Sequence, residues 1–196
     1  RDTLAASVDF ERVRSGPLKL FLCATNVRSG KVRIFKKEEI GVDQVLASAC
    51  LPFLFQAVEI DGEHYWDGGY MGNPAIFPLI YDCASSDVVI VHINPLMRDT
   101  VPNTAHEIMN RINEISFNSS LMREMRAIAF VSKLIDDGHV NGNHLRRMLI
   151  HAIEADEFMR ELSVTSKLNA DWEFLTHLRD IGREAADKWI VEKFAA

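Results

Sequence analysis

The stretch His64-Tyr65-Trp66-Asp67-Gly68-Gly69-Tyr70-Met71-Gly72-Asn73-Pro74 lies between two apolar segments of the chain. Three glycines, an asparagine and a proline follow Asp67 within seven residues. Such a composition can continue neither a helix nor a central strand. We therefore predict a bend here, with Asp67 at the end of the strand that precedes it. A carboxylate on a glycine-rich bend can be directed with little steric obstruction.

Segments with strand character surround this bend. Asp61-Gly62 is a hairpin turn signal, and the residues on either side of it, 58–60 and 64–66, are predicted to form the two strands. Upstream, residues 18–24 and 31–35 predict a strand and its return strand, and a short helix is predicted from Asp43 to Cys50. Strands that alternate with helices predict an α/β fold, in which helices cover a sheet.

The elements predicted after the bend are longer. Asn73 is expected to cap a helix that has Pro74 in its first turn. Residues 87–94 are almost continuously apolar, which predicts a strand covered on both faces. Residues 103–136 are helical in pattern, with a joint at 118–120. A break follows at Asn141-Gly142-Asn143, then a strand over 147–154, and a last helix that Asn169 or Asp171 caps and that reaches Phe194.

The composition narrows the class of protein. A length of 196 residues suits one domain, with 47% hydrophobic and 26% charged residues as in soluble globular proteins. The net charge of −6 argues against a nucleic-acid partner. Three widely spaced cysteines predict buried free thiols, which favours a reducing compartment; a cytoplasmic or membrane-peripheral location is therefore favoured. A start at Arg1 suggests a fragment of a longer chain.

Several short motifs occur together with Asp-Gly-Gly. They are Leu22-Cys23-Ala24-Thr25-Asn26, Gly30-Lys31, Ala47-Ser48-Ala49-Cys50-Leu51-Pro52, Val58-Glu59-Ile60-Asp61-Gly62, Tyr65-Trp66-Asp67-Gly68-Gly69 and Gly72-Asn73-Pro74. In this order they resemble the C-terminal half of patatin-like phospholipases. The tail, Ser166-Lys167-Leu168-Asn169-Ala170-Asp171-Trp172 with Gly182-Arg183-Glu184-Ala185-Ala186, resembles that of bacterial members of the family. The resemblance covers residues 18–74 most closely and the rest of the chain loosely.

The resemblance implies a three-layer α/β/α sandwich and a serine acyl hydrolase. The whole of 1–196 would be one domain, with a sheet core over about 1–100 and a mainly helical extension over about 101–196. Such enzymes hydrolyse carboxylic esters of lipids, phospholipase A-like, with a Ser-Asp dyad, and Asp67 matches the aspartate. Gly68, Gly69 and Asn73 would be supporting loop positions. The mechanism implies no metal or organic cofactor. The partners would be a lipid or other ester, with a membrane surface as a further candidate.

The nucleophile of the dyad is missing from this sequence. In the family the serine stands in Gly-X-Ser-X-Gly at a strand-to-helix turn, and no serine here has glycine two residues away on both sides. We therefore expect an incomplete sandwich that lacks its N-terminal nucleophile half. The N-terminal part of the same protein would carry the serine, and this chain alone would be inactive.

Other interpretations of these residues stay open. Asp-Gly-Gly alone also describes an ordinary turn in which Asp67 caps a backbone N–H. The histidines show no metal-ligand spacing, and His92 is better explained as a hydrogen-bonded core residue. The arginines at 123, 126, 146 and 147 are best explained as a solvated face. The alternative function is a non-catalytic lipid-binding or protein-interaction module derived from the same family.

Overall fold

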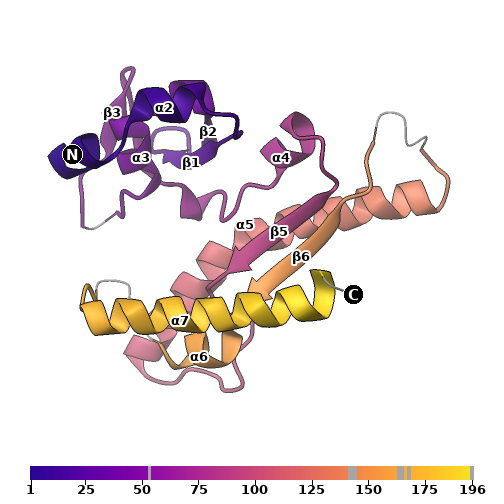
Figure 1. Ribbon diagram of the computed structural model, residues 1–196. Coiled ribbons are helices and arrows are strands. Elements are labelled where there is room, and N and C mark those ends of the chain that lie inside the picture. The colour runs from indigo at the N-terminus through magenta and orange to yellow at the C-terminus, as the bar shows by residue number, and fades with distance from the viewer. Residues whose placement is uncertain (53, 141–144, 163–165, 167–168, 195–196) are drawn as a thin grey trace. The chain divides into compact units, whose positions relative to one another are not determined.

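The computed structural model describes residues 1–52, 54–140, 145–162, 166 and 169–194 (Figure 1). The turn predicted at 141–143 lies outside these residues. The chain divides into two compact units, the first made of Arg1–Ser85 and Ser119–Arg147 and the second of Ser86–Asn118 and Met148–Ala196. Both units combine helices with strands, which confirms the predicted α/β class. The three-layer sandwich, incomplete for lack of its N-terminal nucleophile half, and the single domain over 1–196 stay predictions.

The first unit is built on a four-stranded antiparallel sheet. Its strands are β1 (Phe21–Asn26), β2 (Val32–Lys36), β3 (Val58–Ile60) and β4 (Glu63–Asp67), in the order β2-β1-β4-β3. The central strand β1 pairs with β2 through Phe21 and Lys36 and with β4 through Ala24 and Asp67. The predicted hairpin is confirmed, because β3 pairs with β4 across a turn in which Asp61 and Gly62 both have positive φ.

Short helices surround this sheet. They are α1 (Asp2–Ser7), α2 (Phe10–Ser15), the 3-10 turns Lys37–Glu39 and Gly68–Tyr70, α3 (Val42–Ser48) and α4 (Phe77–Asp82). One apolar cluster packs α2 and α3 against the sheet, and its buried members are Ala24, Phe35, Ile40, Ala47, Ile60 and Tyr65. Within it the rings of Phe35 and Tyr65 meet edge to face, with centroids 5.6 Å apart. Burial of this cluster is what fixes the position of β4, and so of its last residue.

The helix after the bend begins later than predicted. Asn73 does not cap it; α4 starts at Phe77, with Ile76 as the preceding cap residue. The Glu124 carboxylate accepts hydrogen bonds from the backbone N–H groups of Ile76 and Phe77, both at 3.1 Å. The side-chain acceptor for the first N–H groups of α4 therefore comes from Glu124 and not from Asn73. A contact between residues this far apart in the sequence cannot be predicted from residue spacing.

The second unit contains a two-stranded parallel sheet of β5 (Asp87–His92) and β6 (Leu149–Glu154). Its helices are the N-terminal half of α5 (Ala105–Asp136), α6 (Asp156–Glu161) and α7 (Trp172–Trp189), which a π-helical turn, Ile190–Phe194, extends. In Figure 1 α7 runs beside β6, and the rings of His151 and Trp189 join them. As predicted, Asp171 caps α7, accepting from the Phe174 N–H.

Two predictions about the second half of the chain are wrong. Strand β5 is covered on one face only, because Val88, Ile90 and His92 are buried while Val89 and Val91 are 45% and 71% exposed. The joint at 118–120 does not exist either, since α5 continues through it. The side chains of Asn118 and Ser120 are instead buried, and each bonds to another part of the chain: Asn118 to the His92 ring at 3.2 Å, and the Ser120 hydroxyl to the Asn73 N–H at 2.9 Å.

The apolar side chains of α5 differ in burial. Phe117, Leu121 and Ile128 are buried, whereas Ile108, Ile112 and Ile115 are exposed. None of the described helices combines the length and the apolar character needed to cross a bilayer.

Candidate functional site

Asp67 is the last residue of β4, and the chain turns directly after it into the 3-10 segment Gly68–Tyr70. Its main chain is anchored on both sides, since its N–H donates to the Cys50 carbonyl and its carbonyl accepts from the Thr25 hydroxyl, each at 2.8 Å. Its half-buried carboxylate accepts from the Gly69 N–H at 2.6 Å. The predicted strand-end position is confirmed, and so is the backbone cap expected of an ordinary Asp turn. The catalytic role stays a prediction.

The glycines next to Asp67 allow two chain segments to approach closely. A Cβ on Gly68 would stand 2.2 Å from the Cys23 carbonyl oxygen of β1, and one on Gly72 would stand 2.8 Å from the Cys23 sulfur. The Cys23 thiol also donates to the Gly68 carbonyl at 3.6 Å. Gly68 and Gly72 are therefore needed for the close packing of the bend against β1.

Two thiols and a phenol lie within electrostatic reach of the Asp67 carboxylate. Burial, followed by the charges of Asp67 and Glu124, raises the pKa of Cys23 to about 12. Burial and the same Asp67 charge also raise the pKa of Cys50 and of Tyr70. Gly68 and Gly69 are buried and Asp67 is half-buried, so the end of β4 is partly shielded from water.

Residues far away in the sequence complete this loop. The Asn73 N–H donates to the hydroxyl of buried Ser120 at 2.9 Å, and Glu124, one turn further along α5, caps α4. Burial raises the pKa of Glu124, and its hydrogen bonds to Ile76 and Phe77 act in the opposite direction. Sequence reasoning missed Ser120 and Glu124, because a separation of 47 or 48 residues leaves no local signal.

Gly69 and Asn73 lie where the sequence places them, on the loop that leaves Asp67. Gly69 is buried and supplies the N–H that holds the carboxylate, while Asn73 contributes its backbone to the contact with Ser120. Within the part of the chain that the structure describes, no three His, Cys, Asp or Glu side chains form a group that could hold a metal ion.

The other candidates of the sequence have structural roles. His92 is buried and contacts Asn118, as expected of a core histidine. Arg123 and Arg126 are exposed, in agreement with a solvated face. Arg146 instead donates to the Ile80 and Ala84 carbonyls at the end of α4.

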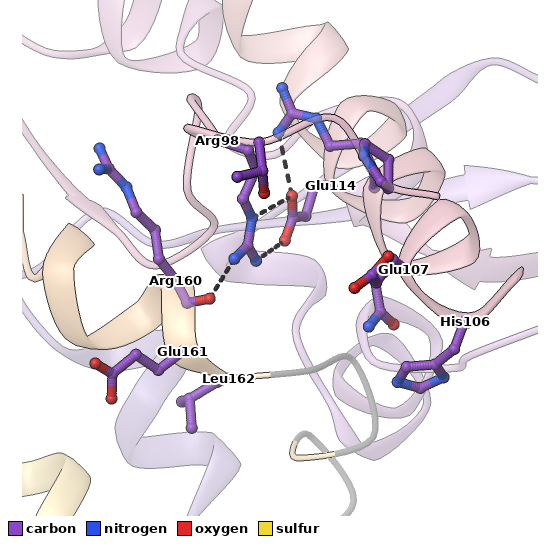
Figure 2. A pocket seen from close by; sticks show the side chains of 11 residues that line it. Arg98, His106, Glu107, Glu114, Arg160, Glu161 and Leu162 are labelled. Carbon is purple, nitrogen blue, oxygen red and sulfur yellow. Dashed lines mark hydrogen bonds and ion pairs between the residues drawn. The ribbon is translucent and has the colours of Figure 1, made fainter. Parts of the chain in front are cut away.

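A second polar cluster lines a cavity of about 300 Å³ in the second unit (Figure 2). Arg98 lies between the Glu114 carboxylate and the backbone carbonyl of Arg160, and Arg111 reaches the same carboxylate at 3.1 Å. Although burial acts to raise it, the hydrogen bonds of these two arginines hold the pKa of Glu114 below its usual range. The cluster ties the segment after β5 to α5 and α6, and three arginines face three glutamates around it.

Fold and site together define a mixed α/β protein that holds an acidic side chain on a glycine bend at a strand end. Residues 9–80, which include this bend, match the family model of the patatin-like phospholipases. For residues 9–80 the match confirms the resemblance read from the motifs, and it supports a function of the lipid-hydrolase type with a lipid or ester substrate. A search of curated proteins found no match.

Proposed function

We propose that Asp67 is the acid–base member of a Ser-Asp dyad in a lipid acyl hydrolase, and that the serine comes from a part of the protein outside these 196 residues. The observation that carries the proposal is the position of Asp67. Within the patatin-like segment, its half-buried carboxylate is held at the end of β4 by the Gly69 N–H. The absence of Gly-X-Ser-X-Gly from the sequence supports the second part.

The chemistry asked of Asp67 is a proton transfer. The serine oxygen would form a bond to the ester carbonyl carbon while its proton passes to the carboxylate. The proton would then go to the departing alkoxide when the ester C–O bond breaks, which leaves an acyl-enzyme that water hydrolyses by the same route. A carboxylate is a weak base, so this reaction depends on a fixed geometry. The anchored main chain of Asp67 and the packed Gly68 supply such rigidity.

The test compares two aspartates of the same hairpin. Asp67→Asn and Asp61→Asn each remove one carboxylate, and Asp61 is an exposed turn residue whose positive φ asparagine also adopts. In a form of the protein that contains the serine, hydrolysis of a short-chain p-nitrophenyl ester is expected to fall by at least about 10²-fold in Asp67→Asn. Asp61→Asn should leave it unchanged. Full activity of Asp67→Asn would refute the dyad.

The origin of the serine is tested separately. The chain of 196 residues is expected to turn over no ester by itself. Turnover by this chain that Asp67→Asn abolishes would show that the nucleophile is already present. A longer protein that encodes no serine of this type would instead support the non-catalytic lipid-binding module.

A further inference from the structure

The first unit contains a second feature that the dyad does not use. A cavity of about 300 Å³ opens at one end of the four-stranded sheet, where β1 begins and β2 ends. Its lining combines three lysines with three apolar residues, namely Lys19, Lys36, Lys37, Pro17, Leu20 and Phe21. Ammonium groups beside apolar surface match a ligand that is both anionic and apolar.

Two of the three ammonium groups are held in place without being neutralised. Lys19 donates to the backbone carbonyl of Asp82, and Lys37 donates to the Gly16 carbonyl at 2.8 Å. Among the described residues, Lys36 alone of these three lysines contacts a carboxylate, that of Asp82 at 3.0 Å. Carbonyl oxygens position an ammonium but leave its charge available to an anion. The positive charges of Lys19 and Lys37 can therefore act on a ligand in the cavity.

The charge of the lining is unusual for this protein. Three lysines face two acidic residues, Asp82 and the exposed Glu38, so the lining carries a net charge of 3 − 2 = +1. The whole chain carries −6. The cavity therefore attracts an anion, although the net negative charge of the whole chain repels one. Glu38 is the acidic side chain here that lies next to the lysines in sequence, and its charge opposes that attraction.

Apolar side chains continue from the cavity to the surface. Leu18 is 79% exposed and Leu20 is 41% exposed, on either side of Lys19 in the sequence. Exposed leucines next to an ammonium group suit an amphiphile whose charged group enters the cavity and whose chains remain along the apolar rim.

Strand β1 connects the cavity with the bend that holds Asp67. Phe21 and Cys23 share one face of β1, about 7 Å apart along the strand, and Cys23 packs directly against Gly68 and Gly72. From the other side, α4 follows the bend in the chain and ends at Asp82, a residue of the cavity lining. In a phospholipid only the short glycerol unit separates the phosphate from the ester carbonyl, so the two groups can lie along this stretch of β1.

We infer that this cavity binds the phosphate group of an anionic ester lipid. The inference rests on the proposed function in taking a lipid as the ligand. A phosphate offers several oxygens to ammonium groups that converge from different directions, and lysine binds it as a point charge. Binding at the cavity fixes one end of the lipid, whose ester then lies toward the bend.

The experiment measures binding rather than hydrolysis, by calorimetric titration of the 196-residue chain. The probes are monomeric dihexanoylphosphatidic acid, uncharged dihexanoylglycerol, and inorganic phosphate. Lys19→Gln and Lys37→Gln each remove one charge from the cavity, and Lys31→Gln is the matched control, because Lys31 is exposed and lies before the opposite end of β2. Glu38→Gln removes the opposing charge. Circular dichroism and urea unfolding confirm that each variant is folded.

Phosphatidic acid is expected to bind more tightly than either other probe. Lys19→Gln and Lys37→Gln should each weaken it about tenfold, as the loss of one hydrogen bond to a charged group does, while Lys31→Gln changes nothing and Glu38→Gln tightens binding. Equal binding of dihexanoylglycerol, or lysine variants that behave like Lys31→Gln, would overturn the inference. Inorganic phosphate that binds as tightly as the lipid would overturn the assignment to a lipid.

The two proposals fail in different ways. Asp67→Asn should bind phosphatidic acid like the unaltered chain, so a failed dyad leaves the titration intact. Lysine variants that bind normally would leave the activity test of Asp67 untouched.

Discussion

Gly68 is the described glycine at which an added side chain would clash most severely with the rest of the protein. Replacing it with alanine would place a Cβ 2.2 Å from the oxygen and 2.4 Å from the carbon of the Cys23 carbonyl. Ordinary van der Waals contact begins at 3.4 Å, so the segment around Gly68 and strand β1 would have to separate by about 3.4 − 2.2 = 1.2 Å. The blocking atoms belong to the main chain of the central strand β1 and cannot rotate away.

The free-energy cost of this separation depends on the strand pairings that β1 makes. Cys23 is paired with Ile34 of β2, and its neighbour Ala24 is paired with Asp67. Overpacking of this kind costs about 1–3 kcal/mol, and loss of one hydrogen bond at the end of the β1–β4 ladder adds about 1 kcal/mol. We expect Gly68→Ala to lower the free energy of unfolding by about 3 kcal/mol, a large part of the ~5–15 kcal/mol typical of a domain.

Urea unfolding followed by circular dichroism measures this change. Gly182→Ala is the control, because Gly182 lies inside α7 with no atom within 4 Å of the added Cβ, and it should raise stability by about 1 kcal/mol. Adding Cys23→Ala to Gly68→Ala should restore nothing, since the carbonyl remains. A Gly68→Ala protein within about 1 kcal/mol of the unaltered chain, or one that Cys23→Ala rescues, would refute this account of the bend.

Three further predictions concern Glu114 in the polar cluster of the second unit, and Glu124 and Cys23 near the bend that follows Asp67. Glu114→Gln should lower the free energy of unfolding by about 3 kcal/mol in urea, because it leaves Arg98 and Arg111 without their buried carboxylate; Glu161→Gln, an exposed residue of the same cavity, should have little effect. Burial raises the folded-state pKa of Glu124 above its ordinary 4.5. Between the unfolded and the folded pKa, the folded protein therefore binds more protons than the unfolded chain does. Stability should therefore fall as pH rises from about 4.5 toward the raised pKa, and Glu124→Gln should remove this slope; a slope that persists would contradict the assignment. Cys23 should react faster with a thiol reagent in Asp67→Asn, because this variant removes one cause of its raised pKa. In Asp61→Asn the rate should be that of the unaltered protein. Identical rates in the two variants would show that the Asp67 charge does not act on Cys23.

Local signals in the sequence predicted the elements that local chemistry determines. Asp61-Gly62 predicted the hairpin because both residues accept positive φ, and Asp171 predicted the start of α7 because its side chain reaches a nearby N–H. The end of β4 at Asp67 followed from the glycines after it. In each case the deciding interaction spans three residues or fewer.

Interactions between distant segments were beyond such reasoning. Glu124 replaces Asn73 as the cap of α4 from 48 residues away, and the contact of Gly68 with Cys23 depends on which strand lies beside β4. The apolar run of β5 did not reveal that Val91 would be exposed, because hydrophobicity alone does not say whether a second face is covered. Patterns of residue type predict elements, whereas tertiary contacts decide their boundaries and surroundings.

The chemistry around Asp67 also bears on which nucleophile could serve it. The Cys23 thiol packs against the bend, and a pKa of about 12 leaves almost none of it as thiolate at neutral pH. The Asp67 charge is itself one cause of that pKa, so an ionised Asp67 suppresses the thiolate beside it. The proposed serine would not depend on prior ionisation, because its hydroxyl would pass its proton to the carboxylate as it attacks. Cys23 is therefore a poor nucleophile here, and the proposed dyad takes its hydroxyl from another segment.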